Sequence, residues 1–300
     1  MLYINNITKT YCGKTVLSDI TFNIEKNKVL GIIGPNGGGK STIIKLLLNI
    51  IQPDSGTINF SKSYDKSNHT IGYLPEERGL YKDMKVKEHI IYIALMKGLS
   101  YKQASQNTMF YLKRFNILNW SNKVIGQLSK GMQQKVQFIC AIINSPDLLI
   151  LDEPLSGLDP NTKHELCNEI SLLKKKGTTI IFSSHNMDVI ESLCDNIIFI
   201  KNGKIILSGN TNTITHHYKK NMYELVCTNV SRAFISEVLH IATIKETEYQ
   251  KDSIILTIKS INKLDLEKLI FKYYKEMNIV SYREIRPSLK DIYIKIINIR

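Results

Sequence analysis

A glycine-rich segment at positions 34–42, Gly-Pro-Asn-Gly-Gly-Gly-Lys-Ser-Thr, carries the residue types that bind phosphate. Gly34, four further residues, Gly39, Lys40 and Ser41 match the spacing of a phosphate-binding loop. In such a loop, backbone N–H groups surround the phosphates, the lysine reaches the outer phosphates and the serine hydroxyl ligates Mg²⁺. The alternative is a glycine-rich turn with a chance lysine. The spacing predicts a nucleotide site.

Two adjacent carboxylates, Asp152 and Glu153, follow a segment of nearly continuous apolar residues, 147–151. Such a run is typical of a buried strand in a parallel sheet, and carboxylates at its end are costly unless they meet a metal or a proton-transfer task. Asp152 suits Mg²⁺, and Glu153 suits the orientation of an attacking water. An N-cap is the structural alternative, but the turn 156–160 separates the pair from a helix predicted at 161–176.

Two further candidates lie at a helix start and a strand end. Ser129 and Gly131 precede a predicted helix, and small residues at a helix N-terminus leave N–H groups free for an anion. His185 follows the buried strand predicted at 178–183. A lone histidine is more often structural, but ligands of open parallel sheets bind at the carboxyl ends of the strands. His185 is therefore a candidate for the same site.

Tyr11 lies between two predicted antiparallel strands, 1–8 and 16–24, ahead of the phosphate loop. An aromatic ring there can stack on a purine base or pack against the loop, and the residues alone leave both readings open.

The elements that must position these residues form an α/β fold. The predicted strands of the first domain, 1–210, are 1–8, 16–24, 29–33, 57–60, 70–74, 147–151, 178–183, 197–201 and 204–208. A helix at 43–51 follows the phosphate loop, a helical insertion spans about 86–145, and Asn202-Gly203 marks the last hairpin.

A second domain is predicted at 221–300, after a polar linker at 211–220. The expected order is strand 222–228, helix 231–239, strands 242–247 and 253–258, helix 263–277 and strand 279–285. This β-α-β-β-α-β order is typical of small α+β ferredoxin-like domains. An amphipathic segment, 288–297, closes the chain, and no chemical constellation appears in this region.

Composition narrows the class of protein. The chain has 300 residues, 43% hydrophobic and 22% charged, as expected of a globular protein. Five scattered cysteines without a Cys-x-x-Cys pair argue against a disulfide framework or a zinc site, so an intracellular location is expected. Neither a signal peptide nor a membrane-spanning run is expected. The net charge of +13 is spread along the chain, which does not indicate nucleic-acid binding.

Together these motifs resemble the nucleotide-binding subunits of ABC transporters over about residues 1–210. The matching segments, in the family's order, are Gly34 to Thr42 as Walker A, Leu128 to Gln133 as the signature, Leu148 to Glu153 as Walker B, Ser156 to Asp159 as the D-loop and His185 as the switch histidine. The resemblance implies a P-loop NTPase fold with an antiparallel β subdomain and a helical subdomain. It also implies a dimer in which two subunits sandwich two ATP molecules.

The resemblance assigns roles to individual residues. Phosphate contacts fall on Asn36, Gly37, Gly38, Gly39, Lys40, Ser41 and Thr42. Glu153 would polarise the attacking water, His185 would contact the γ-phosphate, and Tyr11 would stack on adenine. Ser41 and Asp152 would serve Mg²⁺. Ser129, Gly131 and Met132 would reach the ATP of the partner subunit, and Asp159 would link the two sites.

Two departures from the family pattern are visible. The signature reads Leu-Ser-Lys-Gly-Met instead of Leu-Ser-Gly-Gly-Gln, with Ser129 and Gly131 retained. Glu76 occupies the position of the Q-loop glutamine; its carboxylate can ligate Mg²⁺ but cannot donate an amide hydrogen bond. Both variants resemble the branch of bacterial sodium-extrusion-type and drug or peptide exporters, whose ATPase subunits often carry a small C-terminal domain.

The leading interpretation is a cytoplasmic ATPase, peripheral on the inner face of the cell membrane, that powers a separate integral membrane subunit. The family places that contact on the loop from Glu76 to Met84 and the following helices. The alternative is a soluble ABC-type ATPase acting on ribosomes or nucleic acid; it is disfavoured because one cassette, no heptad run and no cysteine ligands are present. A binding-only regulator is disfavoured because Glu153 and His185 are retained.

Overall fold

The computed structural model describes residues 2–60, 70–77, 79–250, 253–260 and 262–298. The chain divides into two compact units, Met1–Thr211 and Asn212–Arg300. None of the helices in these described ranges combines the length and the apolar character needed to cross a bilayer.

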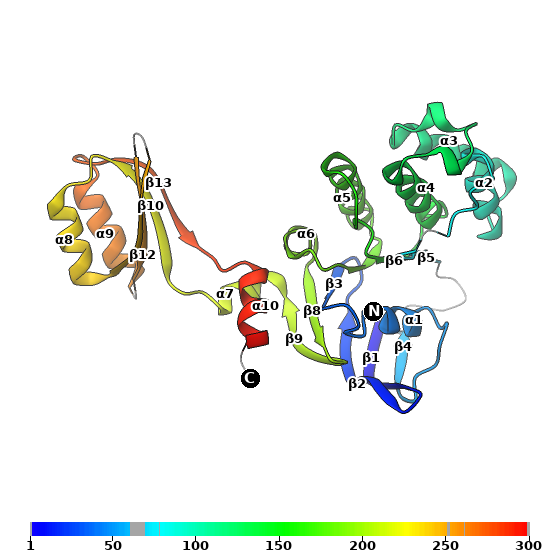
Figure 1. Ribbon diagram of the computed structural model, residues 1–300, viewed down its shortest axis with the longest axis horizontal. Coiled ribbons are helices and arrows are strands. Elements are labelled where there is room, and N and C mark those ends of the chain that lie inside the picture. Colours follow the sequence, from blue (N-terminus) through cyan, green and yellow to red (C-terminus); the bar gives the residue numbers. More distant parts are fainter. Residues whose placement is uncertain (1, 61–69, 78, 251–252, 261, 299–300) are drawn as a thin grey trace. The chain divides into compact units, whose positions relative to one another are not determined.

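A six-stranded sheet forms the centre of the first unit (Figure 1). Its order is β5 (Ile71–Leu74), β6 (Leu148–Asp152), β7 (Thr179–Ser183), β3 (Val29–Ile33), β8 (Asn196–Lys201) and β9 (Lys204–Asn210). The first five strands run parallel, and β9 returns antiparallel to β8 through Asn202-Gly203. Every residue of β3, β6 and β7 is buried, which accounts for their apolar sequences.

A three-stranded antiparallel sheet, of order β2-β1-β4, forms a second layer of this unit. It consists of β1 (Leu2–Tyr11), β2 (Lys14–Ile24) and β4 (Ser55–Phe60). Ile4 and Ile20 of this sheet belong to one core with Ile32 of β3 and Ile44 of the first helix. The alternating apolar residues thus pack one face of this sheet against β3 and the first helix.

The helix after the phosphate loop, α1 (Lys40–Leu47), differs in its bounds from the predicted 43–51. It begins at Lys40 because Gly39, at φ 111°, reverses the chain immediately before it. It stops before Asn49, whose φ of 58° is left-handed. The earlier start places Lys40 and Ser41 in the first helical turn.

The predicted helical insertion contains α2 (Val86–Met96), α3 (Tyr101–Arg114), two short 3₁₀ turns (η1, Leu118–Trp120, and η2, Ile125–Gln127) and α4 (Lys130–Ile142). Ser100 and Gln103 form a capping box at the start of α3. The remaining helices of this unit are α5 (Pro160–Lys175) and α6 (Met187–Leu193).

The second unit contains a four-stranded antiparallel sheet built from β10 (Met222–Thr228), β11 (Thr243–Gln250), β12 (Ser253–Lys259) and β13 (Asn278–Ile285). Its order, β11-β12-β10-β13, is the ferredoxin-like arrangement expected from the β-α-β-β-α-β pattern. Helices α8 (Arg232–Ile241) and α9 (Lys263–Tyr273) share its core (Figure 1). A last helix, α10, spans Leu289–Asn298.

The segment 211–220, predicted as a polar linker, contains a helix instead: α7 (Thr211–His217). Thr211, Ile214 and Thr215 are buried, although the composition of the segment is polar. Thr211 donates from Oγ1 to the carbonyl of Cys194, 2.9 Å away. Internal hydrogen bonds therefore offset the cost of burying its hydroxyl groups.

Candidate active site at the carboxyl edge of the parallel sheet

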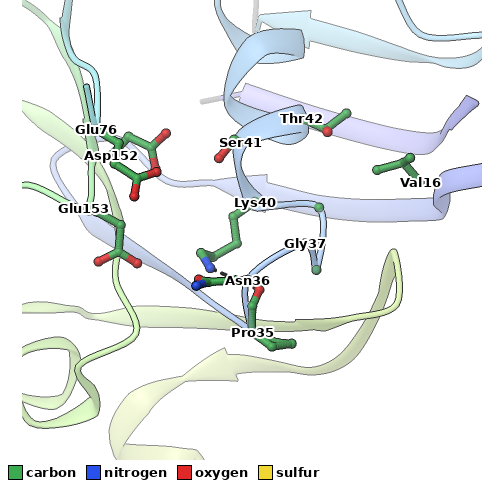
Figure 2. A pocket seen from close by; sticks show the side chains of 12 residues that line it. Val16, Pro35, Asn36, Gly37, Lys40, Ser41, Thr42, Glu76, Asp152 and Glu153 are labelled. Carbon is green, nitrogen blue, oxygen red and sulfur yellow. Dashed lines mark hydrogen bonds between the residues drawn. The ribbon is translucent and has the colours of Figure 1, made fainter. Parts of the chain in front are cut away.

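A cavity of about 410 Å³ lies where the phosphate loop meets the carboxyl ends of β5 and β6 (Figure 2). Its lining comprises Val16, Pro35, Asn36, Gly37, Gly38, Gly39, Lys40, Ser41, Thr42, Glu76, Asp152 and Glu153. Figure 2 shows the three carboxylates on one side and the phosphate loop on the other. The cavity has the size of a small-molecule pocket, for which about 300–1,000 Å³ is usual.

The phosphate loop requires glycine at two positions that shape its turn. A Cβ atom on Gly34 would clash with the carbonyl oxygen of Ile200, and Gly39 has the left-handed φ of 111°. Lys40 is only 7% exposed, and its Nζ donates to the carbonyls of Gly34, at 2.8 Å, and Pro35, at 3.2 Å. The ammonium group is thus held across the loop, at the start of a helix whose N-terminus favours anions.

Asp152 and Glu153 are both buried at the end of β6, 4% and 8% exposed. Ser183, at the end of neighbouring β7, joins them: its Oγ donates to Asp152 Oδ1 at 2.6 Å and accepts from the Glu153 N–H at 3.0 Å. Glu153 has a φ of 46°, which is left-handed. The hydroxyl of Ser183 therefore fixes the first carboxylate and the unusual backbone of the second.

His185 lies beside Glu153, with Nδ1 3.0 Å from Glu153 Oε2. Burial raises the pKa of Glu153, while the contact with His185 and the charge of Lys40 oppose the rise. Glu76 adds a smaller upward contribution to the same pKa. A carboxyl group whose pKa is raised by burial holds a proton more readily, which suits general-base chemistry.

The third carboxylate of the cavity belongs to Glu76, two residues after β5. Ser41, Asp152 and Glu76 present one hydroxyl and two carboxylate groups, the oxygen donors that Mg²⁺ prefers. Within the described part of the chain, no group of three His, Cys, Asp or Glu side chains is arranged for a metal. The residues present, one hydroxyl and two carboxylates, are oxygen donors of the kind that fits Mg²⁺.

The signature residues lie outside this cavity, at the start of α4. Ser129 is the N-cap, and its Oγ accepts from the Met132 N–H at 3.3 Å. A Cβ atom on Gly131 would lie 3.2 Å from Thr162 Oγ1 and 3.4 Å from Asp159 Oδ2. Asp159 itself caps α5, because its Oδ1 accepts from the Thr162 N–H at 3.0 Å. The signature and the D-loop therefore form one joined surface, separate from the phosphate loop of the same chain.

Tyr11 stands apart from the residues that line the cavity. The residue is 41% exposed, with Lys9 Nζ 5.7 Å from the ring centroid. Val16, on the paired strand β2, does line the cavity and was not predicted from the sequence. Ser183 was also not predicted from the sequence. It ends a fully buried strand that pairs with the strand of Asp152, and its position at that strand end was a usable signal.

The model of the family described as "ABC transporter" matches residues 17–156. The uncharacterized ABC transporter ATP-binding protein YhaQ of Bacillus subtilis is 36% identical over 98% of each chain. The linearmycin resistance ATP-binding protein LnrL, also from Bacillus subtilis, is 27% identical over 99% of this chain and 98% of its own.

A solved structure, that of an ATP binding subunit of an ABC transporter, superposes with a TM-score of 0.66 at 30% identity, covering 73% of this chain and 93% of that one. The matched cassette contains the phosphate loop and Asp152-Glu153 that line the cavity. The chain therefore belongs to the family of ABC transporter ATP-binding proteins, in which ATP hydrolysis is coupled to transport.

Proposed function

We propose that this chain is the ATP-hydrolysing subunit of an exporter of ions, drugs or peptides, held on the cytoplasmic face of the membrane by a separate membrane subunit. The observation that carries the catalytic part is one cavity lined by Lys40, Asp152 and Glu153. The export direction is supported by LnrL, a resistance protein similar over nearly the whole chain. The cargo would be chosen mainly by the membrane subunit.

In the proposed reaction the loop amides and Lys40 bind the phosphates, and Ser41, Asp152 and Glu76 hold Mg²⁺. When bound there, Mg²⁺ would supply positive charge to the phosphate oxygens and so favour attack on the γ-phosphorus. Glu153 orients the attacking water and accepts its proton, which its raised pKa favours. His185, which contacts Glu153, would contact the γ-phosphate. Tyr11 would stack on adenine, since its hairpin borders the cavity through Val16.

We further propose that a second copy, or a similar ATPase subunit, completes each site. Ser129, Gly131 and Met132 lie outside the cavity of their own chain, so they are available to a nucleotide on another subunit. Ser129 places its hydroxyl at the N-terminus of α4, where helix N–H groups favour a phosphate. Asp159, which lies close to Gly131, would link the two nucleotide sites of the dimer.

The proposed membrane contact is supported by exposed apolar side chains on and before α2. Tyr81, Tyr92, Leu95 and Met96 are 55%, 41%, 41% and 71% exposed. Spacings of three and four residues place Tyr92, Leu95 and Met96 on neighbouring parts of one helix surface. The rings of Tyr81 and Tyr92 lie 6.1 Å apart. A clustered apolar surface of this kind is typical of a protein interface.

Replacement of the proposed base tests the catalytic part. Glu153→Gln keeps the shape and removes the proton acceptor, so ATP hydrolysis by the purified chain should fall about 100-fold or more, within the usual range for a general base. Nucleotide binding should persist. Glu25→Gln, an exposed carboxylate outside the cavity, is the matched control. Unchanged hydrolysis in Glu153→Gln would remove this residue as the base.

A pull-down from detergent-solubilised membranes tests the transporter part. A polytopic membrane protein should be recovered with the chain and lost in a Tyr92→Ala/Met96→Lys variant. Ile50→Lys, at an apolar residue elsewhere that is 61% exposed, should retain it. Recovery of the chain alone, or of ribosomes or nucleic acid, would contradict the proposal.

A further inference from the structure

Three glutamines near the start of α4 all donate their side-chain amides to loop carbonyls. Gln133 Nε2 donates to the carbonyl of Ile125, at 3.3 Å, and to that of Leu128, the first residue of the signature, at 3.1 Å. Gln134 Nε2 donates to the Pro154 carbonyl at 2.8 Å, directly after Glu153. These two amides fasten the signature loop and the end of the Glu153 segment to one helix.

Gln137, one turn further along, contacts a different loop. Its Nε2 donates to the carbonyl of Pro75 at 3.0 Å and to that of Glu77 at 3.2 Å. These carbonyls lie on either side of Glu76. A single amide group therefore bridges the backbone on both sides of the residue whose carboxylate lines the nucleotide cavity.

The chemistry of this contact is specific to an amide donor. Gln137 is 6% exposed, and a buried polar side chain is costly unless it is hydrogen-bonded. Two carbonyl oxygens face the same side-chain atom, so that atom must be the NH₂ group and not the oxygen. The Oε1 atom is buried and has no partner among the described residues. The two donated bonds are therefore the hydrogen bonds that the Gln137 side chain makes with the described residues.

We infer that Gln137 is a positioning residue for the ATPase reaction: it holds the loop that carries Glu76 and thereby directs this carboxylate to the Mg²⁺ position. The inference rests on the proposed role of Glu76 in metal binding. Because α4 begins within the signature, Gln137 also connects the Glu76 loop to the helix that carries the surface proposed to meet a partner's nucleotide. Residues that orient a metal ligand typically alter metal affinity about 10–100-fold when replaced.

The decisive experiment measures metal binding in the purified full chain. Mn²⁺ is titrated in the presence of ATP, the free ion is followed by its EPR signal, and the Mg²⁺ concentration for half-maximal hydrolysis is measured beside the maximal rate. The variants are Gln137→Met, of similar length without donors, Glu76→Ala, and both together. Gln137→Asn, which keeps an amide too short to reach both carbonyls, serves if the methionine variant does not fold.

Asn107→Leu is the matched control, since Asn107 Nδ2 also donates to a backbone carbonyl, that of Ile143 at the C-cap of α4, 3.1 Å away, and not to the carbonyls of Pro75 or Glu77. It should leave metal binding unchanged. Hydrogen–deuterium exchange in the peptide around Pro75–Glu77 should accelerate in Gln137→Met and not in the control.

The expected result is Mn²⁺ affinity weakened about tenfold in both single variants, as for other residues that support a metal ligand, with no further loss in the double variant. Weakened binding in Glu76→Ala with wild-type binding in Gln137→Met would overturn the inference and leave the role of Glu76 intact. Wild-type binding in Glu76→Ala would overturn both. A purely structural role of Gln137 predicts a lower maximal rate with unchanged metal affinity, which also contradicts the inference.

Discussion

The six-stranded sheet of the first unit and the four-stranded sheet of the second unit differ in where their strands end, and so in where they place polar side chains. In the first unit, parallel strands β3, β5, β6 and β7 all end at one edge, and the residues that follow them line or border one cavity. In the second unit every neighbouring pair is antiparallel, so successive strands end at opposite edges. Its charged side chains form ion pairs with each other, as Arg283 does with Glu224 at 2.6 Å.

This difference explains why chemistry gathers in one unit. A parallel sheet brings residues from segments far apart in sequence to one edge, where its strands end. In an antiparallel sheet neighbouring strands end at opposite edges, so the residues that follow them are separated. The apolar residues of the second unit form a separate core, which includes Phe234, Leu225 and Ile258. The comparison predicts that damage to the second core leaves nucleotide chemistry intact.

The largest effect is expected from Phe234→Ala. Phe234 is fully buried between the sheet and α9, and its ring is 5.5 Å from that of Tyr273. Its truncation should lower the free energy of unfolding of the second unit by about 3–5 kcal/mol. Thermal unfolding should show one destabilised transition, with nucleotide affinity unchanged. A matching loss of nucleotide binding would break the comparison.

The next effect concerns nucleotide affinity. Lys40→Met removes the buried ammonium group and should weaken ATP binding by about 1.5–3 kcal/mol, the usual contribution of a hydrogen bond to a charged group. Titration with a fluorescent ATP analogue measures the change. Lys45→Met, an exposed lysine on the same helix, is the control and should bind as the wild type does.

Ser183→Ala sharpens the strand-end argument, because this residue contributes no group to the cavity itself. Loss of its hydroxyl leaves Asp152 Oδ1 and the Glu153 N–H without this partner, at a cost of about 1–3 kcal/mol. We expect the rate of hydrolysis at low Mg²⁺ to fall by a factor that corresponds to a similar free energy, as measured by steady-state kinetics. Ser183→Thr, which retains the hydroxyl, should recover most of the rate; equal losses in both variants would point to packing instead.

The smallest effect is a pH shift. A base works deprotonated, so activity is lost as the pH falls through the pKa of Glu153, which burial raises. The charge of Glu76 contributes to that rise, so Glu76→Gln should lower the pKa and move the acid limb of the rate profile to lower pH. Glu77→Gln, the adjacent residue outside the cavity lining, should leave the limb in place. A limb moved to higher pH would contradict the assignment.

Local spacing was enough to predict the phosphate loop, the Asp152-Glu153 pair and the β-α-β-β-α-β order, because each depends on residues close together in the chain. The contacts of Ser183 and Gln137 join segments 31 and 60 or more positions apart. Local spacing does not predict either contact, although the place of Ser183 at the end of a buried strand was a signal that the sequence offered. The bounds of α1 depend on the left-handed backbone of Gly39 and Asn49. Helix α7 was not predicted because its threonines are polar, and a polar composition indicated a linker.

The most direct test of a nucleotide site shared between copies is the size of the Glu153→Gln variant in the presence of ATP and Mg²⁺. Light scattering should report a stable dimer, since bound ATP that is not hydrolysed holds the two copies together. In the same background, Ser129→Arg should give a monomer that still binds ATP, because the signature would act only on the partner's nucleotide. A dimer that survives Ser129→Arg, or loss of ATP from the monomer, would contradict this arrangement.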